Sequence, residues 1–335
     1  MQPHSIIKTR QGIYCDAGQC FIDPWSPTPV ALITHAHGDH AYTGSDLYYC
    51  SKPCEAILRY RLGADARIIA KPYREKFKLG QAWISFHPAG HILGSSQIRI
   101  EVGSNVTVIS GDYKRQVDPT CEPFEVLLCD EFLTESTFAL PIYSWPSPEQ
   151  VAQDIFDWWQ KNAQQEQASI LFCYALGKAQ HVQSLLKKYT DQPVLVHGAI
   201  AALNQIYEQE GVVLSAWKKP QESDLKNFTH ELILAPPSAA GSPWLKRFAP
   251  YKTALASGWM AVRGTRRRKG FDTGFILSDH ADWNALIGTI EETCAKKVWV
   301  THGNEEVLAR YLHQMKKIEA YSFHLAGWSS DEGED

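Results

Sequence analysis

The hydrophobic and polar positions of the first 130 residues form short runs separated by glycine and proline. Short apolar runs bounded by such residues are typical of β-strands. They predict strands at residues 13–16, 20–23, 30–34, 47–50, 82–87, 96–102, 106–109 and 126–129. One helix is expected at residues 53–62, so this part of the chain is predicted to be mostly β.

The pattern changes after a proline-rich stretch at residues 141–148. Ser147 has the chemistry of a helix N-cap and Pro148 suits the first helical position, which predicts a helix to about residue 163. Beyond it, predicted strands alternate with predicted helices: strands at 170–173, 193–197, 231–235 and 253–256, and helices at 177–189 and 199–209. This alternation predicts a parallel α/β unit.

The last part of the chain returns to strands that lead into polar residues. Strands are expected at residues 274–278, 297–301 and 320–325, with helices at 282–295 and 305–318. His280 and His302 lie just after the first two of these strands. Active-site residues of layered α/β folds gather at strand ends, so both histidines are candidates for a site.

Length and composition place the chain among ordinary globular proteins. Its 335 residues suffice for two domains, and 44% hydrophobic with 21% charged residues is a common balance. No apolar run reaches the roughly 18 residues that a membrane span needs. The first ten residues lack the apolar segment of a secretory signal, so we expect a cytoplasmic protein without membrane contact. The eight cysteines include no Cys-x-x-Cys pair, which favours free buried thiols.

Charge is unevenly distributed. The net charge of −4 argues against a basic coat for nucleic acid, but it leaves room for a local basic groove. The dense basic run consists of Arg263, Arg266, Arg267, Arg268 and Lys269. We expect this run to form a rim that binds a nucleic-acid strand, the alternative being a solvated charged loop. The acidic tail at residues 329–335 is expected to be disordered.

The strongest chemical signal follows the predicted strand at residues 30–34. The motif His-x-His-x-Asp-His comprises His35, His37, Asp39 and His40. Imidazole nitrogens suit zinc and related transition metals, and carboxylate oxygens accept the same ions. Four such groups within six residues predict a metal site rather than a solvated polar loop.

Further polar residues sit at other strand ends. They are Asp16, His91, Asp112, Glu135, His280 and His302. Each has an ordinary alternative: Asp16 could cap a turn, Asp112 after Gly111 is a common turn, and His91 could be a loop residue. Each residue alone is a weak indication of a functional site. The evidence for such a site is the order of these residues along the chain, taken together with the histidine motif.

That order resembles the metallo-β-lactamase fold, and within it the β-CASP nuclease branch. Asp16, residues 35–40, His91 and Asp112 match the first four motifs, and Glu135, His280 and His302 match the three β-CASP motifs. The resemblance implies an αββα sandwich at residues 1–140 and 263–328 with a β-CASP α/β insertion at 141–262. Within this branch the chain resembles the bacterial DNA-ligase-associated exonuclease group, on residues 174–180, residues 257–260 and the run from 263 through 269 to 279–283.

The resemblance also implies a mechanism. His35, His37 and His91 would bind one divalent ion, and Asp39, His40 and His302 the other, with Asp112 between them. The ions would be Zn²⁺ or Mn²⁺, and a pair about 3.5–4 Å apart would lower the pKa of a shared water. His280, held by Glu135, would act as the acid, and Asp16 would orient a ligand.

Two groups outside these motifs are candidates for gripping substrate. Lys178 opens a predicted helix and could hold an anion with its neighbouring backbone N–H groups; a plain helix start is the alternative. Ser242 ends a small-residue stretch at 237–242, where a second phosphate loop competes with a simple surface turn.

The leading hypothesis is a two-metal DNA exonuclease that works in repair beside a DNA ligase and a helicase. An RNA nuclease of the 3′-end-processing or ribonuclease J type is the alternative, because RNA-processing members of the branch carry the histidine that His302 matches. A small-ester or thioester hydrolase would need neither the insertion nor the basic run. A non-catalytic binding subunit would be expected to lack metal ligands.

Overall fold

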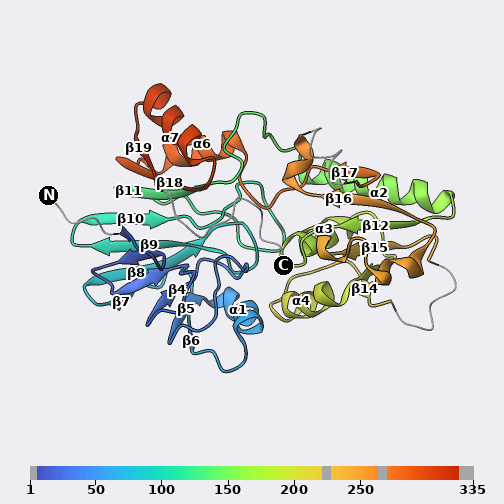
Figure 1. The fold of residues 1–335 in the computed structure, drawn as a ribbon, viewed down its shortest axis with the longest axis horizontal. Helices are drawn as coiled ribbons and strands as arrows, with labels where there is room; N and C mark the ends of the chain where they lie inside the picture. Colours follow the sequence, from blue (N-terminus) through green and yellow to red (C-terminus); the bar gives the residue numbers. More distant parts are fainter. Residues whose placement is uncertain (1–5, 221–227, 263–269, 324–335) are drawn as a thin grey trace. The chain divides into compact units, whose positions relative to one another are not determined.

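The computed structural model describes residues 6–220, 228–262 and 270–323. The described chain divides into two compact units (Figure 1). Unit 1 contains residues up to 141 and from 280 onward, and unit 2 contains residues 142–279. The basic run at 263–269 and the acidic tail at 329–335 lie outside the described residues.

Unit 1 contains two sheets. The first, sheet A, has the strand order β1-β2-β3-β4-β5-β6. Its strands are β1 (Ile7–Lys8), β2 (Ile13–Cys15), β3 (Cys20–Ile22), β4 (Ala31–Leu32), β5 (Tyr48–Ser51) and β6 (Ile68–Lys71). A short 3₁₀ turn, η1 (Lys52–Cys54), leads from β5 into helix α1 (Glu55–Leu62). The strand expected at 30–34 is therefore present in shortened form.

The second sheet of unit 1, sheet B, has the order β19-β18-β11-β10-β9-β8-β7. Its strands are β7 (Phe77–Leu79), β8 (Ala82–Pro88), β9 (Ser96–Val102), β10 (Asn105–Ile109), β11 (Glu131–Ser136), β18 (Lys297–Gly303) and β19 (Glu319–Ser322). Helices α6 (Trp283–Glu292) and α7 (Glu305–Tyr311) belong to the same unit, and α7 continues into a π-helical turn, η6 (Leu312–Lys316).

Sheet B is buried on both faces, and its side chains alternate between two cores. One core joins the sheets and contains Ile13, Ile22 and Leu32 of sheet A with Ile84, Ile98, Ile109 and Leu133 of sheet B. The other core contains Val108, Phe132, Val298 and Val300 of sheet B with Leu286, Ile290 and Leu308 of α6 and α7. The period of two along each strand thus places helices on one face of sheet B and sheet A on the other.

Unit 2 is a parallel α/β unit, as the alternation of strands and helices predicted. Its sheet has the order β14-β13-β15-β12-β16-β17, and every neighbouring pair is parallel. The strands are β12 (Ala168–Phe172), β13 (Val194–Val196), β14 (Trp217–Lys218), β15 (Leu232–Ala235), β16 (Tyr251–Ala256) and β17 (Thr273–Phe275). The helices are α2 (Pro148–Gln164), α3 (Lys178–Leu186) and α4 (Gly198–Gln209), with 3₁₀ turns η3 (Pro237–Ala239), η4 (Pro243–Phe248) and η5 (Gly258–Ala261).

The start of α2 confirms the predicted cap, since the Ser147 hydroxyl accepts a hydrogen bond from the Gln150 N–H at 3.2 Å. Unit 2 extends to residue 279, beyond the boundary at 262 that the sequence suggested. The reason is β17, which pairs in parallel with β16 and so belongs to the sheet of unit 2.

The strand expected at residues 126–129 is absent, and these residues form an irregular segment. Two of its apolar side chains face solvent: Leu128 is 68% exposed and Val126 is 38% exposed. The prediction was wrong because a short apolar run does not by itself reveal a strand partner. The buried strand lies just beyond, at β11.

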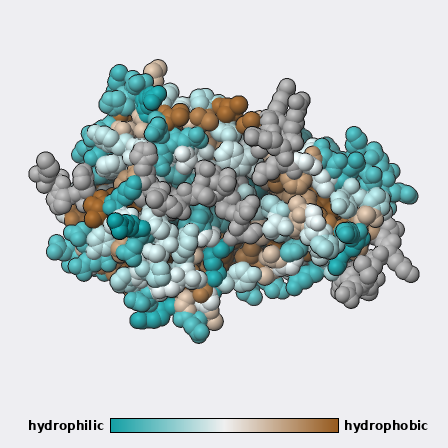
Figure 2. Space-filling model, viewed as in Figure 1, coloured by the Kyte–Doolittle hydropathy of each residue, from teal (hydrophilic) through white to brown (hydrophobic). Residues whose placement is uncertain are grey.

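Figure 2 shows polar residues over most of the visible face of each unit, with hydrophobic residues in small patches. Among the described residues, no helix combines the length and the apolar character required to cross a bilayer.

Candidate metal centre

The loop after β4 brings the histidine motif into the interior of unit 1. Asp39 and His37 are half-buried, whereas His35 and His40 are fully buried. The loop closes in a turn in which the His37 carbonyl accepts hydrogen bonds from the N–H groups of His40 and Ala41. The loop and this turn bury the imidazoles of His35 and His40. Burial of polar groups costs free energy unless they have partners, so partners for these rings are expected.

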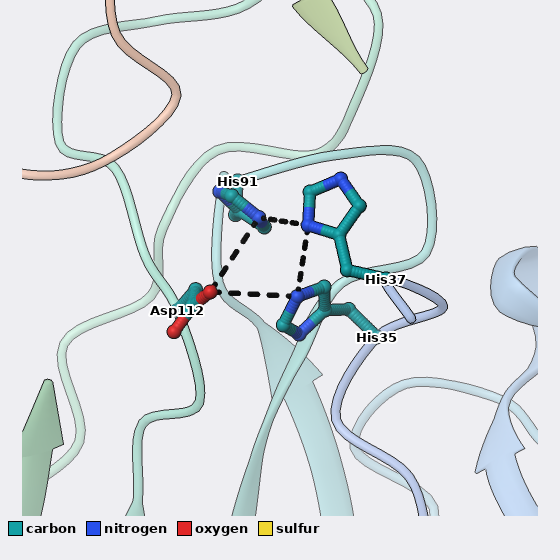
Figure 3. Close-up of side chains that lie close together, drawn as sticks. All are labelled: His35, His37, His91 and Asp112. Carbon is teal, nitrogen blue, oxygen red and sulfur yellow. Dashed lines mark hydrogen bonds and ion pairs between the residues drawn. The ribbon is translucent and has the colours of Figure 1, made fainter. Parts of the chain in front are cut away.

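Four side chains form the first group of possible metal ligands (Figure 3). His35 Nε2 and His91 Nε2 each lie 3.1 Å from His37 Nδ1. An Asp112 carboxylate oxygen lies 3.5 Å from His35 Nε2 and 3.9 Å from His91 Nε2. His91 comes from the loop between β8 and β9, and Asp112 from the loop after β10. Residues far apart in sequence therefore converge on one point, with all four ligand atoms within 4.8 Å of one another.

The second group consists of Asp39, His40 and His302. His40 Nε2 lies 3.8 Å from an Asp39 oxygen and 3.5 Å from an Asp112 oxygen. The same Asp112 oxygen thus faces His35 of the first group and His40 of the second. Asp112 occupies the position that a residue shared between two neighbouring ions would need.

A third group joins Asp112 to Glu135 and His280. His280 Nδ1 lies 2.8 Å from a Glu135 carboxylate oxygen, to which the Thr137 hydroxyl also donates at 2.7 Å. The other Glu135 oxygen accepts the Tyr113 N–H at 2.7 Å. This carboxylate fixes the His280 ring with its Nδ1 side occupied, and the ring lies 4.7 Å from the His91 ring.

Opposite charges face each other inside this cluster. Burial lowers the pKa of His40, but the carboxylates of Asp112 and Asp39 outweigh it and hold that pKa well above its usual value. Burial raises the pKa of Asp112, but His40, His302 and His280 hold it well below its usual value. Burial and the positive charge of His40 keep the pKa of His35 well below its usual range. A metal ion would therefore compete with a proton for His40.

The carboxylate that orients His40 is Asp23, which the sequence reading did not select. An Asp23 oxygen lies 2.8 Å from His40 Nδ1 and accepts the Thr34 hydroxyl at 2.5 Å. The other oxygen accepts the Thr34 N–H at 2.8 Å. Asp16, which we expected in this role, lies in an exposed turn between β2 and β3. We therefore assign the orienting role to Asp23 and correct the expectation for Asp16.

The pairing of the strands, which the structure shows, distinguishes Asp23 from Asp16. Asp23 follows β3, which pairs in parallel with β4, the strand that leads into the histidine loop. The ends of neighbouring parallel strands lie together, whereas Asp16 follows β2, two strands away from β4.

His302 adopts an unusual backbone conformation at the end of β18. Its φ angle is +54°, a left-handed value that costs free energy for a residue with a β-carbon. The Ser136 hydroxyl contacts the carbonyl oxygens of Thr301 and His302 at 3.0 and 3.1 Å. At Gly303, a β-carbon would lie 2.4 Å from the Ser136 carbonyl oxygen, so glycine is required there. The end of β11 thus holds the turn that presents His302.

The residues expected to bind substrate are not supported in that role by their positions. Lys178 is buried in unit 2, where its Nζ lies 3.4 Å from an Asp279 carboxylate oxygen. A buried lysine paired with a carboxylate does not offer its charge to a strand at the surface, so the structure does not support that role. Ser242 is half-buried and precedes η4, a turn of six residues. The expected rim of Arg263, Arg266, Arg267, Arg268 and Lys269 lies outside the described residues.

The donor set of the first group fits a transition-metal ion. Tetrahedral ligands at the usual zinc–nitrogen distance of about 2.0–2.1 Å are separated by roughly 3.3 Å. Two of the nitrogen separations here are 3.1 Å, close to that spacing. Buried histidine and aspartate clusters of this kind could bind divalent metal ions, with imidazole and carboxylate suiting zinc or manganese.

No protein-family model matches the chain. It is 29% identical to a probable DNA ligase of Opitutus terrae, over 94% of this chain and 31% of that protein. It is 23% identical to an RNase J-like protein of Methanocaldococcus jannaschii, over 52% of this chain and 49% of that protein. The chain therefore spans about a third and about half of the lengths of these two curated relatives.

A crystal structure of a protein of unknown function from Enterococcus faecalis V583 is similar in fold. Its TM-score is 0.60 at 13% sequence identity, and the alignment covers 87% of this chain and 78% of that one. At this identity the likeness concerns the fold alone. Of this chain itself, the structure shows buried His and Asp groups that could hold a metal ion.

Proposed function

We propose that the chain is a two-metal-dependent nuclease that hydrolyses the phosphodiester bonds of DNA as an exonuclease. The observation that carries this proposal is the shared carboxylate. Asp112 faces His35 of one ligand group and His40 of the other at the same distance of 3.5 Å. Two ligand groups joined by one carboxylate are the arrangement that a pair of neighbouring ions requires.

We assign His35, His37, His91 and Asp112 to one ion and Asp39, His40, His302 and Asp112 to the other. When bound, two such ions supply an activated water and neutralise charge on a phosphoryl group. The chain's own part is to fix the ligands in place. Asp23 holds His40 with Nδ1 occupied, which leaves Nε2 directed at Asp39 and Asp112.

We assign His280 as the general acid that protonates the leaving oxygen. Glu135 occupies its Nδ1, which leaves Nε2 as the nitrogen that can give up a proton. Thr137 and the Tyr113 N–H hold Glu135 on its other sides, so the imidazole has little freedom to rotate. A positioned acid of this kind contributes about 10²–10⁴-fold to a rate.

We further propose that unit 1 has the metallo-β-lactamase fold and that unit 2 is a β-CASP insertion. Two facing sheets with α6 and α7 on one outer side support the first assignment. The wholly parallel sheet of unit 2, inserted between β11 and α6 in sequence, supports the second.

The choice of DNA rests on the relative named as a probable DNA ligase, which aligns with 94% of this chain. We further propose that the protein works with a DNA ligase and a helicase in DNA repair, in the cytoplasm. RNA is the second candidate, because the other relative is named an RNase J-like protein and because His302 belongs to the second ligand group.

One digestion experiment tests these assignments. DNA and RNA strands of one sequence, labelled at the 5′ or the 3′ end, are incubated with the protein and Mn²⁺ or Zn²⁺. The proposal predicts stepwise shortening of DNA and no hydrolysis by the His40→Ala variant, which should still bind the strand. Faster degradation of RNA would favour the second candidate, and a fully active His40→Ala variant would contradict both.

A further inference from the structure

Tyr42 is an exposed aromatic residue on the loop that carries the histidine motif. It lies two residues beyond His40, so the two α-carbons are at most about 7 Å apart. Its side chain is 37% exposed, whereas Ala41 between the two residues is buried. Among the described residues, the Tyr42 ring has no ring partner and its hydroxyl has no hydrogen bond. An accessible aromatic ring therefore lies close in the chain to a ligand of the proposed metal site.

The backbone around Tyr42 is irregular but held at several points. The buried Tyr48 hydroxyl donates to the Tyr42 carbonyl oxygen at 2.9 Å and accepts the Ser45 N–H at 2.8 Å. The Thr28 N–H donates to Ser45 Oγ at 3.1 Å, and the Thr28 carbonyl oxygen accepts the Asp46 N–H at 3.0 Å. Tyrosine has only two side-chain torsions, so a ring on a backbone held in this way loses little conformational freedom when it contacts a ligand.

A single exposed aromatic residue is common on protein surfaces, so the chemistry of the loop has to decide what this ring contacts. Residues 35–46, all of which the structure describes, contain no lysine or arginine and carry the carboxylates of Asp39 and Asp46. The loop therefore has no fixed positive side chain for a phosphate. Within these residues the large exposed apolar group is the Tyr42 ring, whose flat face matches that of a nucleobase.

We propose that the Tyr42 ring stacks on a base of the nucleic-acid strand, next to the phosphate that is cleaved. This inference rests on the proposed nuclease function and adds a base-binding contact to it. A base offers an open face in a single strand or at a strand end, whereas bases inside a duplex are covered on both faces. Every base has a π-face, so the contact is insensitive to base identity. It suits an enzyme that shortens strands from an end without sequence preference.

The test compares Tyr42→Ala, Tyr42→Phe and Tyr60→Ala with the unmodified protein. Phenylalanine keeps the ring and removes the hydroxyl, and Tyr60 is the matched control because it is 55% exposed on α1, outside the loop. Cleavage kinetics with Mn²⁺ are measured on a strand that the unmodified protein cleaves. They are repeated on the same strand with abasic nucleotides on both sides of the first bond cleaved. Circular dichroism and metal content by mass spectrometry verify that each variant is folded and holds metal.

We expect Tyr42→Ala to raise KM about 5- to 150-fold on the intact strand, the size of one base stacked on an aromatic ring. The value of kcat should stay within about twofold, because a contact that is equal in the ground state and the transition state affects binding alone. On the abasic strand the same substitution should change KM by less than about twofold, since no base is left to stack. Tyr42→Phe and Tyr60→Ala should behave like the unmodified protein on both strands.

Three results would overturn the inference. One is an unchanged KM of Tyr42→Ala on the intact strand. Another is loss of metal from Tyr42→Ala, or an equal rise of its KM on the intact and the abasic strand, either of which would make Tyr42 a support for the loop. The third is an effect of Tyr42→Phe or Tyr60→Ala as large as that of Tyr42→Ala. An unmodified protein that cleaves neither DNA nor RNA would instead reject the nuclease function together with this contact.

Discussion

Replacing Asp23 by asparagine should weaken metal binding at His40 while leaving the fold in place. In the structure, one Asp23 oxygen lies 2.8 Å from His40 Nδ1 and the other accepts the Thr34 N–H. The carboxylate can only accept hydrogen bonds, so it requires a proton on Nδ1 and leaves the lone pair of Nε2 for a metal ion.

Asparagine has nearly the same shape but carries an NH₂ group in place of one oxygen. If its oxygen keeps the Thr34 N–H, its NH₂ faces His40 Nδ1 and favours the opposite tautomer, with the proton on Nε2. That proton occupies the position from which His40 would bind metal. Loss of such an orienting carboxylate typically costs 10–100-fold in metal affinity, or about 1.4–2.8 kcal/mol.

The assay is isothermal titration of Mn²⁺ into EDTA-treated protein, with circular dichroism to verify folding. Asp16→Asn is the matched control, because Asp16 is exposed in a turn and should change neither metal affinity nor stability by more than about 0.5 kcal/mol. Unchanged affinity in Asp23→Asn, or an equal loss in Asp16→Asn, would refute the reasoning about His40.

Three further outcomes follow from other side-chain contacts and from burial. His280→Gln should lower kcat about 10²–10⁴-fold with metal content unchanged, and a variant that also loses metal would contradict its role as an acid. Ser136→Ala should reduce metal occupancy of the His302 group more than that of the His35 group, measured by titration, and Ser136→Thr should restore it; equal losses would argue against a specific hold on His302. Burial lowers the pKa of His87 below its usual 6.5, so the unfolded chain takes up a proton there before the folded chain does. Stability should therefore fall as pH drops below about 6.5, and less steeply in His87→Gln than in the unmodified protein, when urea unfolding is followed at several pH values.

Much of the fold was predictable from the sequence because its elements have strong periodic patterns. The α/β unit is the clearest case, since apolar strands alternate with capped helices such as the one beginning after Ser147. The irregular segment at 126–129 shows the limit of this reasoning, because hydrophobicity alone does not say whether a strand has a partner. Likewise, the position at which the chain leaves unit 2 could not be predicted, because it depends on the pairing of β17 with β16.

The candidate site was predictable in its members more than in their roles. The histidine motif, His91, Asp112 and His302 could be found because each follows a strand. The structure gathers them into two groups, and within each group the ligand atoms lie within 4.8 Å of one another. Asp23 could not be selected from the sequence, because the pairing of β3 with β4 decides that its carboxylate reaches His40. Lys178 shows the reverse, because the lysine expected to hold an anion is buried with its Nζ 3.4 Å from an Asp279 carboxylate oxygen.

Anomalous X-ray diffraction from crystals grown with Mn²⁺ or Zn²⁺ tests the central claim most directly. Two bound ions should give two peaks about 3.5–4 Å apart, one beside His35, His37 and His91 and the other beside Asp39, His40 and His302. Asp112 should lie between the peaks and contact both. A single peak, or peaks away from Asp112, would contradict the two-metal centre and the nuclease chemistry built on it.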